Sequence, residues 1–143
     1  MKRNIVGFFS MLATTLLLAS PALSAQNRID AYVPFDFSVG QTVMAEGNYQ
    51  VQSISETVEV VQNEASHASA SLIKAIHVQS AGDHGAMLVF HRYGNQYFLS
   101  QIWDGRSNAG IELPESKREK ELNLAAKLTN DGPETVLVAM NWK

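Results

Sequence analysis

The chain has 143 residues, no cysteine and a formal net charge of −3, from 11 Lys and Arg against 14 Asp and Glu. This acidic balance argues against general nucleic-acid binding, because a phosphate backbone is held by clustered Lys and Arg. The absence of cysteine excludes disulfides and thiol chemistry, so packing and hydrogen bonds must stabilise the fold.

The first 25 residues have the pattern of a secretory signal peptide. Two basic residues precede an apolar run over 5–18, and a segment rich in small residues follows it. The run is shorter than the roughly 20 apolar residues of a membrane-spanning helix, and the small residues suit a peptidase site. We expect cleavage after Ala25, or after Ser24, and an uncleaved N-terminal anchor is the alternative. The remaining 26–143 has 9 basic and 14 acidic residues, a net charge of −5.

Strand patterns follow along the chain at intervals of about ten residues. The segment around 35–39 alternates apolar and polar residues, and Pro34 before it favours an edge or a bulge. Turn residues at 46–48 lead into a second predicted strand, and the next strands are predicted at 57–63 and 69–78. Strands separated by turn signals at this spacing are typical of an antiparallel sandwich or a small barrel.

The stretch LVFHRYGNQYFLSQIW, residues 88–103, predicts a hairpin around Gly94-Asn95. A two-residue loop places Arg92 opposite Tyr97, Phe90 opposite Leu99 and His91 opposite Phe98. Arg92 is then expected to stack on Tyr97. The alternative to a purely structural hairpin is a recognition surface at its tip, formed by His91, Arg92, Tyr93 and Tyr97.

One segment has a helical pattern, at about 116–129. Ser116 and Glu119 have capping-box spacing, and Asn130-Asp131-Gly132 provides a stop signal. Leu124 and Leu128 lie one turn apart, so we expect the helix to pack on the sheet through this Leu side. A last strand is predicted at 134–141.

These patterns predict one mainly β domain over 26–143. We expect a small antiparallel sandwich or barrel of about seven strands, with one helix at about 116–129 and a last strand after it.

Four motifs in this order, VPFDFSVG, GNYQV, LVFHRYGNQYFLSQIW and LPESKREKEL, resemble an uncharacterised family of small exported proteins common in acidobacterial genomes. Relatives usually have Leu-Pro-Ala-Gly where this chain has Met44-Ala45-Glu46-Gly47. The resemblance implies export and a shared fold, and it supplies no catalytic residue.

The sequence favours no catalytic, cofactor or metal site. It has no Gly-x-Ser-x-Gly elbow and no phosphate-binding glycine loop. His77, Asp83, His84 and His91 could converge on a metal if their strands paired, but their spacing matches no established ligand motif. We therefore predict no metal site and no enzyme activity.

The leading hypothesis is an exported, non-enzymatic binding or interaction module, secreted or periplasmic, for an unknown protein or small-molecule partner. It would bind no nucleic acid and have no stable membrane anchor after cleavage. One alternative is a small-barrel carrier of an apolar ligand, and the other is an unrecognised envelope enzyme.

Overall fold

The computed structural model describes residues 28–55, 57–73, 76–80, 82 and 84–143, so the predicted signal peptide lies outside the described residues. They form eleven strands and one helix: β1 (Arg28–Val33), β2 (Phe37–Val39), β3 (Thr42–Met44), β4 (Gly47–Ser55), β5 (Val58–Asn63), β6 (Ser69–Ile73), β7 (Ile76–Gln79), β8 (Met87–Tyr93), β9 (Gln96–Trp103), β10 (Ala109–Glu112), α1 (Lys117–Thr129) and β11 (Glu134–Trp142).

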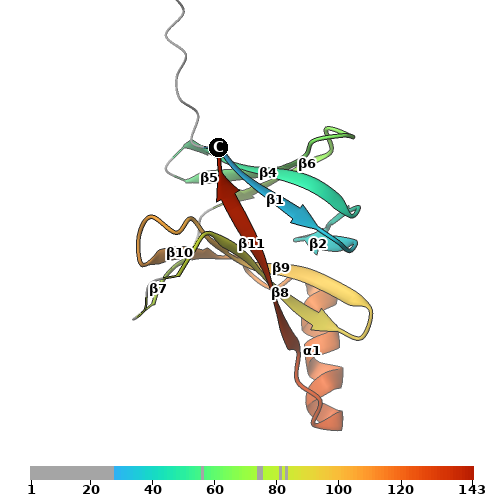
Figure 1. Cartoon of the computed structure of the whole chain (residues 1–143). Helices are drawn as coiled ribbons and strands as arrows, with labels where there is room; N and C mark the ends of the chain where they lie inside the picture. The colour runs from blue at the N-terminus through green and yellow to red at the C-terminus, as the bar shows by residue number, and fades with distance from the viewer. Residues whose placement is uncertain (1–27, 56, 74–75, 81, 83) are drawn as a thin grey trace, which may run out of the picture.

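The strands form one nearly closed, barrel-like sheet in the order β3-β2-β9-β8-β11-β1-β4-β5-β6, while β10 pairs with β9 and β7 pairs with β10. In Figure 1, β11 runs from the part of the sheet that contains β8 and β9 to the part that contains β1 and β4. All pairings are antiparallel except the one between β2 and β9, at Ser38 and Phe98. The predicted mainly β fold with one helix before a last strand is confirmed.

The strand count exceeds the expected seven for identifiable reasons. β3 and β10 have only three and four residues, too short for a clear alternating pattern, and β1 ends directly before Pro34. The single strand predicted over 69–78 is two strands with different neighbours, since β6 pairs with β5 and β7 pairs with β10.

Aromatic side chains fill one end of the barrel. Phe37 lies between Tyr49 and Phe90, with ring centroids 5.0 and 5.2 Å apart in edge-to-face geometry. Phe35 adds a further edge contact to Phe90 and stacks on Tyr97 at 3.8 Å. Phe37, Tyr49 and Phe90 are all buried, so this end of the interior is closed by packing.

Helix α1 forms where the sequence predicts it. The Ser116 hydroxyl accepts a hydrogen bond from the Glu119 backbone N–H at 3.2 Å, and Asn130 ends the helix in the left-handed conformation at φ 59°. The predicted packing face is wrong, because Leu124 is 64% exposed and Leu128 is 90% exposed. Glu119 is the buried residue of the helix. Within the described part of the chain, no helix is long and apolar enough to cross a membrane.

Candidate binding pocket at the open end of the barrel

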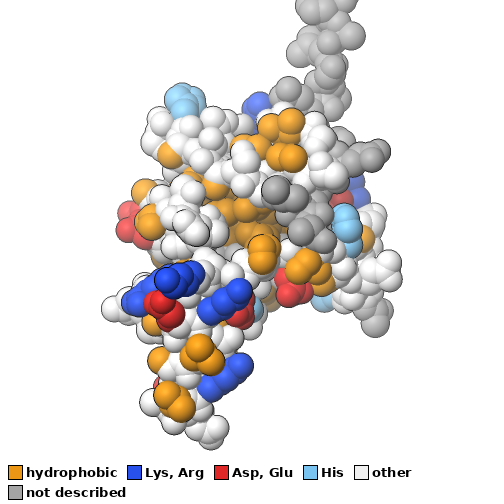
Figure 2. Space-filling model, turned by 180° about the vertical axis from the view of Figure 1, so that it is seen from behind, with side chains coloured by type: hydrophobic (Ala, Val, Ile, Leu, Met, Phe, Trp, Pro, Cys, Tyr) orange, Lys and Arg blue, Asp and Glu red, His pale blue; other side chains and the backbone are white. Residues whose placement is uncertain are grey.

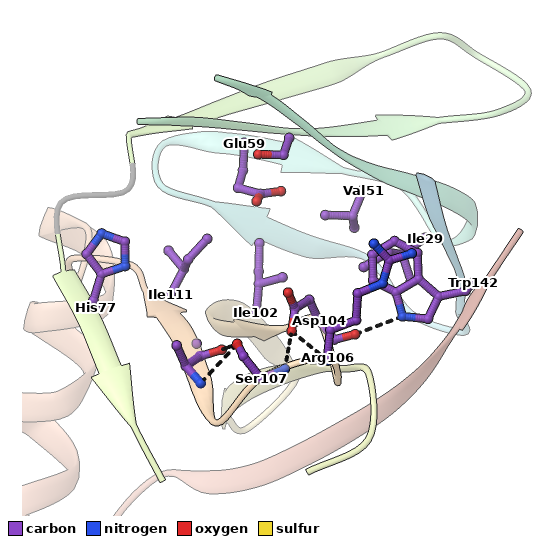
Figure 3. Close-up of a pocket in the computed structure, with 13 residues that line it drawn as sticks. Ile29, Val51, Glu59, His77, Ile102, Asp104, Arg106, Ser107, Ile111 and Trp142 are labelled. Carbon is purple, nitrogen blue, oxygen red and sulfur yellow. Dashed lines mark hydrogen bonds between the residues drawn. The ribbon is translucent and has the colours of Figure 1, made fainter. Parts of the chain in front are cut away.

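A pocket of about 310 Å³ lies in the barrel away from the aromatic cluster. Its apolar lining comes from strands on opposite sides of the interior: Ile29 on β1, Val51 on β4, Ile102 on β9, Ile111 on β10 and Trp142 on β11. These side chains point into a common space (Figure 3). Figure 2, the view from behind, shows hydrophobic side chains at the floor of a hollow in the middle of this face.

On β4, the interior residue becomes smaller from the aromatic end of the barrel toward the pocket. On β4, Tyr49 and Val51 both point inward, two residues apart, and both are at most 1% exposed. The Tyr49 ring fills the barrel interior at the height of this residue, and its hydroxyl donates a hydrogen bond to the Ala45 carbonyl. The Val51 side chain is much smaller, so the barrel interior next to it is left partly open.

Glu59 introduces a carboxylate into this apolar pocket. The strand register pairs Tyr49 with Asn63, Val51 with Val61 and Ser53 with Glu59, so alternate residues of β5 face the interior. Glu59 is only 9% exposed and lines the pocket. Its inward position could not be predicted from the sequence, because valines at 58, 60 and 61 suit either face of the strand and only the pairing with β4 selects one.

The rim is held by a turn packed on the C-terminal strand. The indole N–H of Trp142 donates to the Asp104 carbonyl at 2.9 Å, and the Arg106 guanidinium carbon lies 3.4 Å from the Trp142 ring centroid. The Asp104 carboxylate accepts hydrogen bonds from the backbone N–H groups of Arg106 and Ser107, at 2.9 and 3.3 Å. One wall of the pocket is therefore positioned before any ligand binds.

Close packing behind β10 fixes the opposite wall. A Cβ built on Gly110 would lie 2.7 Å from the Trp103 ring, so the strand can approach that ring only because residue 110 is glycine. Ile111, the next residue, lines the pocket beside its register partner His77 on β7.

The four residues predicted for a hairpin-tip surface lie on two faces of the β8–β9 hairpin. The register pairs Arg92 with Tyr97 and His91 with Phe98, as expected. Gly94 has φ 60° while Asn95 is not in the positive-φ region, the pattern of a type II′ turn. His91 and Tyr93 point to the side of the sheet that α1 covers, whereas Arg92 and Tyr97 contact each other on the other side. The tip surface stays a prediction.

His91 is the centre of a polar chain beneath the helix. Its Nδ1 lies 2.9 Å from Glu119 Oε1, and its Nε2 lies 3.3 Å from the Ser100 hydroxyl. The hydrogen bond to Glu119 raises the pKa of His91, although burial opposes this. The connectivity is that of a serine–histidine–carboxylate triad. Ser100 is only 6% exposed, however, so little of this residue is in contact with solvent.

A second hollow, of about 590 Å³, separates the hairpin tip from the second half of α1. Tyr93 and Arg92 line one side, and Leu122 and Ala126 line the helix side. Among the described residues, the buried Tyr93 hydroxyl has no hydrogen-bond partner. Burial, with the charges of Glu119 and Glu115, raises the pKa of Tyr93 to about 12, so this phenol stays neutral at ordinary pH.

The histidines considered for a metal site occupy separate environments. His77 lines the barrel pocket, His84 contacts the Ser80 hydroxyl and lies 5.1 Å from the Trp103 ring, and His91 lies beneath α1. Asp83 is outside the described residues. Within the described ranges, no group of three or more metal-ligating side chains is assembled.

Comparisons of the chain with protein-family models, with curated proteins and with solved structures give no match.

Proposed function

We propose that this chain is an exported, non-enzymatic binding protein whose half-open barrel holds a small, mainly apolar molecule. The observation that carries the proposal is the pocket whose half-buried walls are Ile111 and Trp142, in a barrel whose other end is filled by aromatic rings. Its volume of about 310 Å³ lies at the lower end of the range for small-molecule pockets. A compact ligand fits this space better than a long lipid chain.

The polar groups of the pocket suggest how such a ligand would be oriented. Glu59 and Asp104 bring carboxylates to the pocket, Ser53 and Ser107 add hydroxyls, and Arg106 and His77 lie at its edge (Figure 3). A few polar groups in an apolar pocket fix the direction of a ligand, while the apolar walls supply most of the affinity. Export is supported by the signal-peptide pattern of the first 25 residues, and with it a periplasmic or secreted location.

An enzyme is the competing proposal, because Ser100, His91 and Glu119 are connected like a catalytic triad. The burial of Ser100 favours a structural role for this chain of hydrogen bonds. Hydrolysis of a simple aryl ester that is lost in Ser100→Ala, while the unfolding midpoint is unchanged, would favour the enzyme.

Filling the pocket tests the binding proposal. The neutral probe N-phenyl-1-naphthylamine should bind the parent protein with a rise in fluorescence. Val51→Phe should weaken this binding by at least about tenfold. Val43→Phe makes the same change at a position that is 76% exposed, and it should bind like the parent.

Two further results complete this test. Because Val51→Phe could disturb the core, Ile111→Phe at the half-buried wall is the second variant, and both are checked by circular dichroism. A parent protein that does not bind the probe, or pocket variants that bind it as well as Val43→Phe does, would contradict the proposal.

A further inference from the structure

The outward face of α1 exposes apolar side chains that the barrel does not use. At 3.6 residues per turn, Lys117, Leu124 and Leu128 lie on one side of the helix, opposite Glu119. Glu119 is buried against the sheet, whereas Leu124 is 64% exposed and Leu128 is 90% exposed. The helix thus directs Glu119 inward and Leu124 and Leu128 outward, the reverse of an ordinary surface helix.

More basic than acidic side chains lie around these leucines. Lys117, Arg118, Lys120 and Lys127 are all exposed, and they are four of the nine basic residues that follow residue 25. Glu121 is the one exposed carboxylate between Lys117 and Thr129, on the same side of the helix as Leu128, and it forms an ion pair with Arg118 at 3.7 Å. Figure 2 shows Lys and Arg side chains, with acidic side chains among them, beside hydrophobic ones on the part of the molecule that projects at the lower left. An otherwise acidic protein therefore presents a local positive charge together with two leucines.

The shape of this region suits a flat partner. In Figure 1, α1 projects beyond β8 and β9, so the outer side of the helix is convex. A convex helix face that exposes two leucines between lysines can bring both to the interface of an anionic bilayer. A protein partner would instead be expected to insert side chains into a groove, and neither Leu124 nor Leu128 lines a hollow next to α1. One of these hollows includes Leu122 and Ala126, and the other includes Lys117 and Glu121 in the first half of the helix.

We propose that the outer face of α1 docks this protein reversibly on an anionic lipid surface. Leu124 and Leu128 enter the boundary between headgroups and acyl chains, and Lys120 and Lys127 remain at the level of the lipid phosphates, with their aliphatic stems against the bilayer. A contact of two leucines and a few lysines is weak and sensitive to salt. It is a peripheral contact, and it requires neither a membrane-spanning segment nor a ligand in the barrel.

Vesicle sedimentation tests this docking. The whole chain recovered after export, with its mass recorded, is mixed with vesicles of phosphatidylglycerol and phosphatidylcholine, or of phosphatidylcholine alone. The parent should sediment with the anionic vesicles at low salt and be released at high salt. Binding to both kinds of vesicle alike, or to neither, would overturn the proposal.

Variants locate the contact on the helix. Leu124→Gln with Leu128→Gln, and separately Lys120→Gln with Lys127→Gln, keep good helix formers at all four positions and should each lower the bound fraction at least about fivefold. Leu137→Gln and Lys143→Gln change an exposed leucine and an exposed lysine outside the helix, and they should bind like the parent. Circular dichroism and unfolding midpoints confirm that each variant is folded. Equal binding by the helix variants and the parent would overturn the assignment to α1.

Discussion

Arg92 makes three contacts at the tip of the β8–β9 hairpin. Its Nε donates to the Gly94 carbonyl at 2.8 Å, its Nη1 lies 3.1 Å from Glu134 Oε2, and its guanidinium carbon is 5.5 Å from the Tyr97 ring centroid. The expected stacking on Tyr97 is therefore accompanied by a link from the hairpin to β11. The stacking could be predicted because a two-residue turn fixes which residues face each other, whereas the link to β11 depends on a distant strand.

Arg92→Ala should lower the free energy of unfolding by about 0.5–2 kcal/mol, through loss of the cation–π contact and the hydrogen bonds. Denaturant unfolding beside the parent measures the change. Lys120→Ala, at an exposed helix position, is the control and should stay within about 0.5 kcal/mol of the parent. An unchanged midpoint and slope for Arg92→Ala would mean that Arg92 does not brace the hairpin, and would favour the tip surface.

His91 should make the stability of the protein depend on pH. Its pKa is raised by the hydrogen bond to Glu119 and by the charges of Glu119, Glu115 and Glu112, and burial acts against them. A histidine with a raised folded-state pKa stabilises the fold fully below its unfolded pKa of about 6.5. This contribution is lost as the pH rises through the raised pKa.

The test compares the parent with His91→Gln by denaturant unfolding at a series of pH values. The difference in unfolding free energy should be largest below about pH 6.5 and should shrink toward alkaline pH. His77→Gln, which removes an exposed histidine on β7, controls for the loss of a histidine as such. A difference that stays constant with pH would show that His91 is not linked to folding by its protonation.

At the scale of elements, the ends of α1 could be predicted from the sequence and its packing face could not. Ser116 and Asn130 act on backbone groups within a few residues, so their effect is local. The orientation of the helix depends on what lies on the sheet beneath it. There His91 provides a partner for Glu119, and this polar contact places Leu124 and Leu128 outside.

Leu124→Ala and Leu128→Ala should each change the unfolding free energy by less than about 0.5 kcal/mol, because both side chains are exposed and alanine favours helix. Leu122→Ala removes a half-buried leucine from the same helix and should cost about 1 kcal/mol or more. Denaturant unfolding of the three variants measures this contrast. A loss at Leu124 as large as that at Leu122 would contradict the helix orientation described above.

For the whole molecule, the fold class could be predicted but the cavity could not. Alternating strands, turn residues and one helical segment identify a small β domain from local patterns. The pocket depends on which residues of β4, β9 and β11 meet at the same level of the barrel, and that is set by pairing between distant strands. The inward position of Glu59 follows from the same registers.

The predicted export has a direct test. Intact-mass measurement of the protein taken from its native envelope should show a chain that lacks residues 1–25, or 1–24 if the cut follows Ser24. The physical reason is an apolar run too short for a stable span, followed by small residues that a peptidase accepts. Full-length protein in the membrane fraction would favour the uncleaved anchor.

The pairing of β1 with β11 has a consequence for the timing of folding. Ile29 lies opposite Trp142, so two strands separated by nearly the whole domain are neighbours in the sheet. Until β11 has been synthesised, β1 lacks one of its two partners and β8 has an unpaired edge. Contacts between such distant segments require a large loop to close first, which slows folding relative to a helical protein of the same size. A nascent chain of this topology cannot complete its sheet until β11 has been made, so it remains unfolded for longer. A translocation channel admits unfolded chains, so this delay would keep the chain able to pass through one.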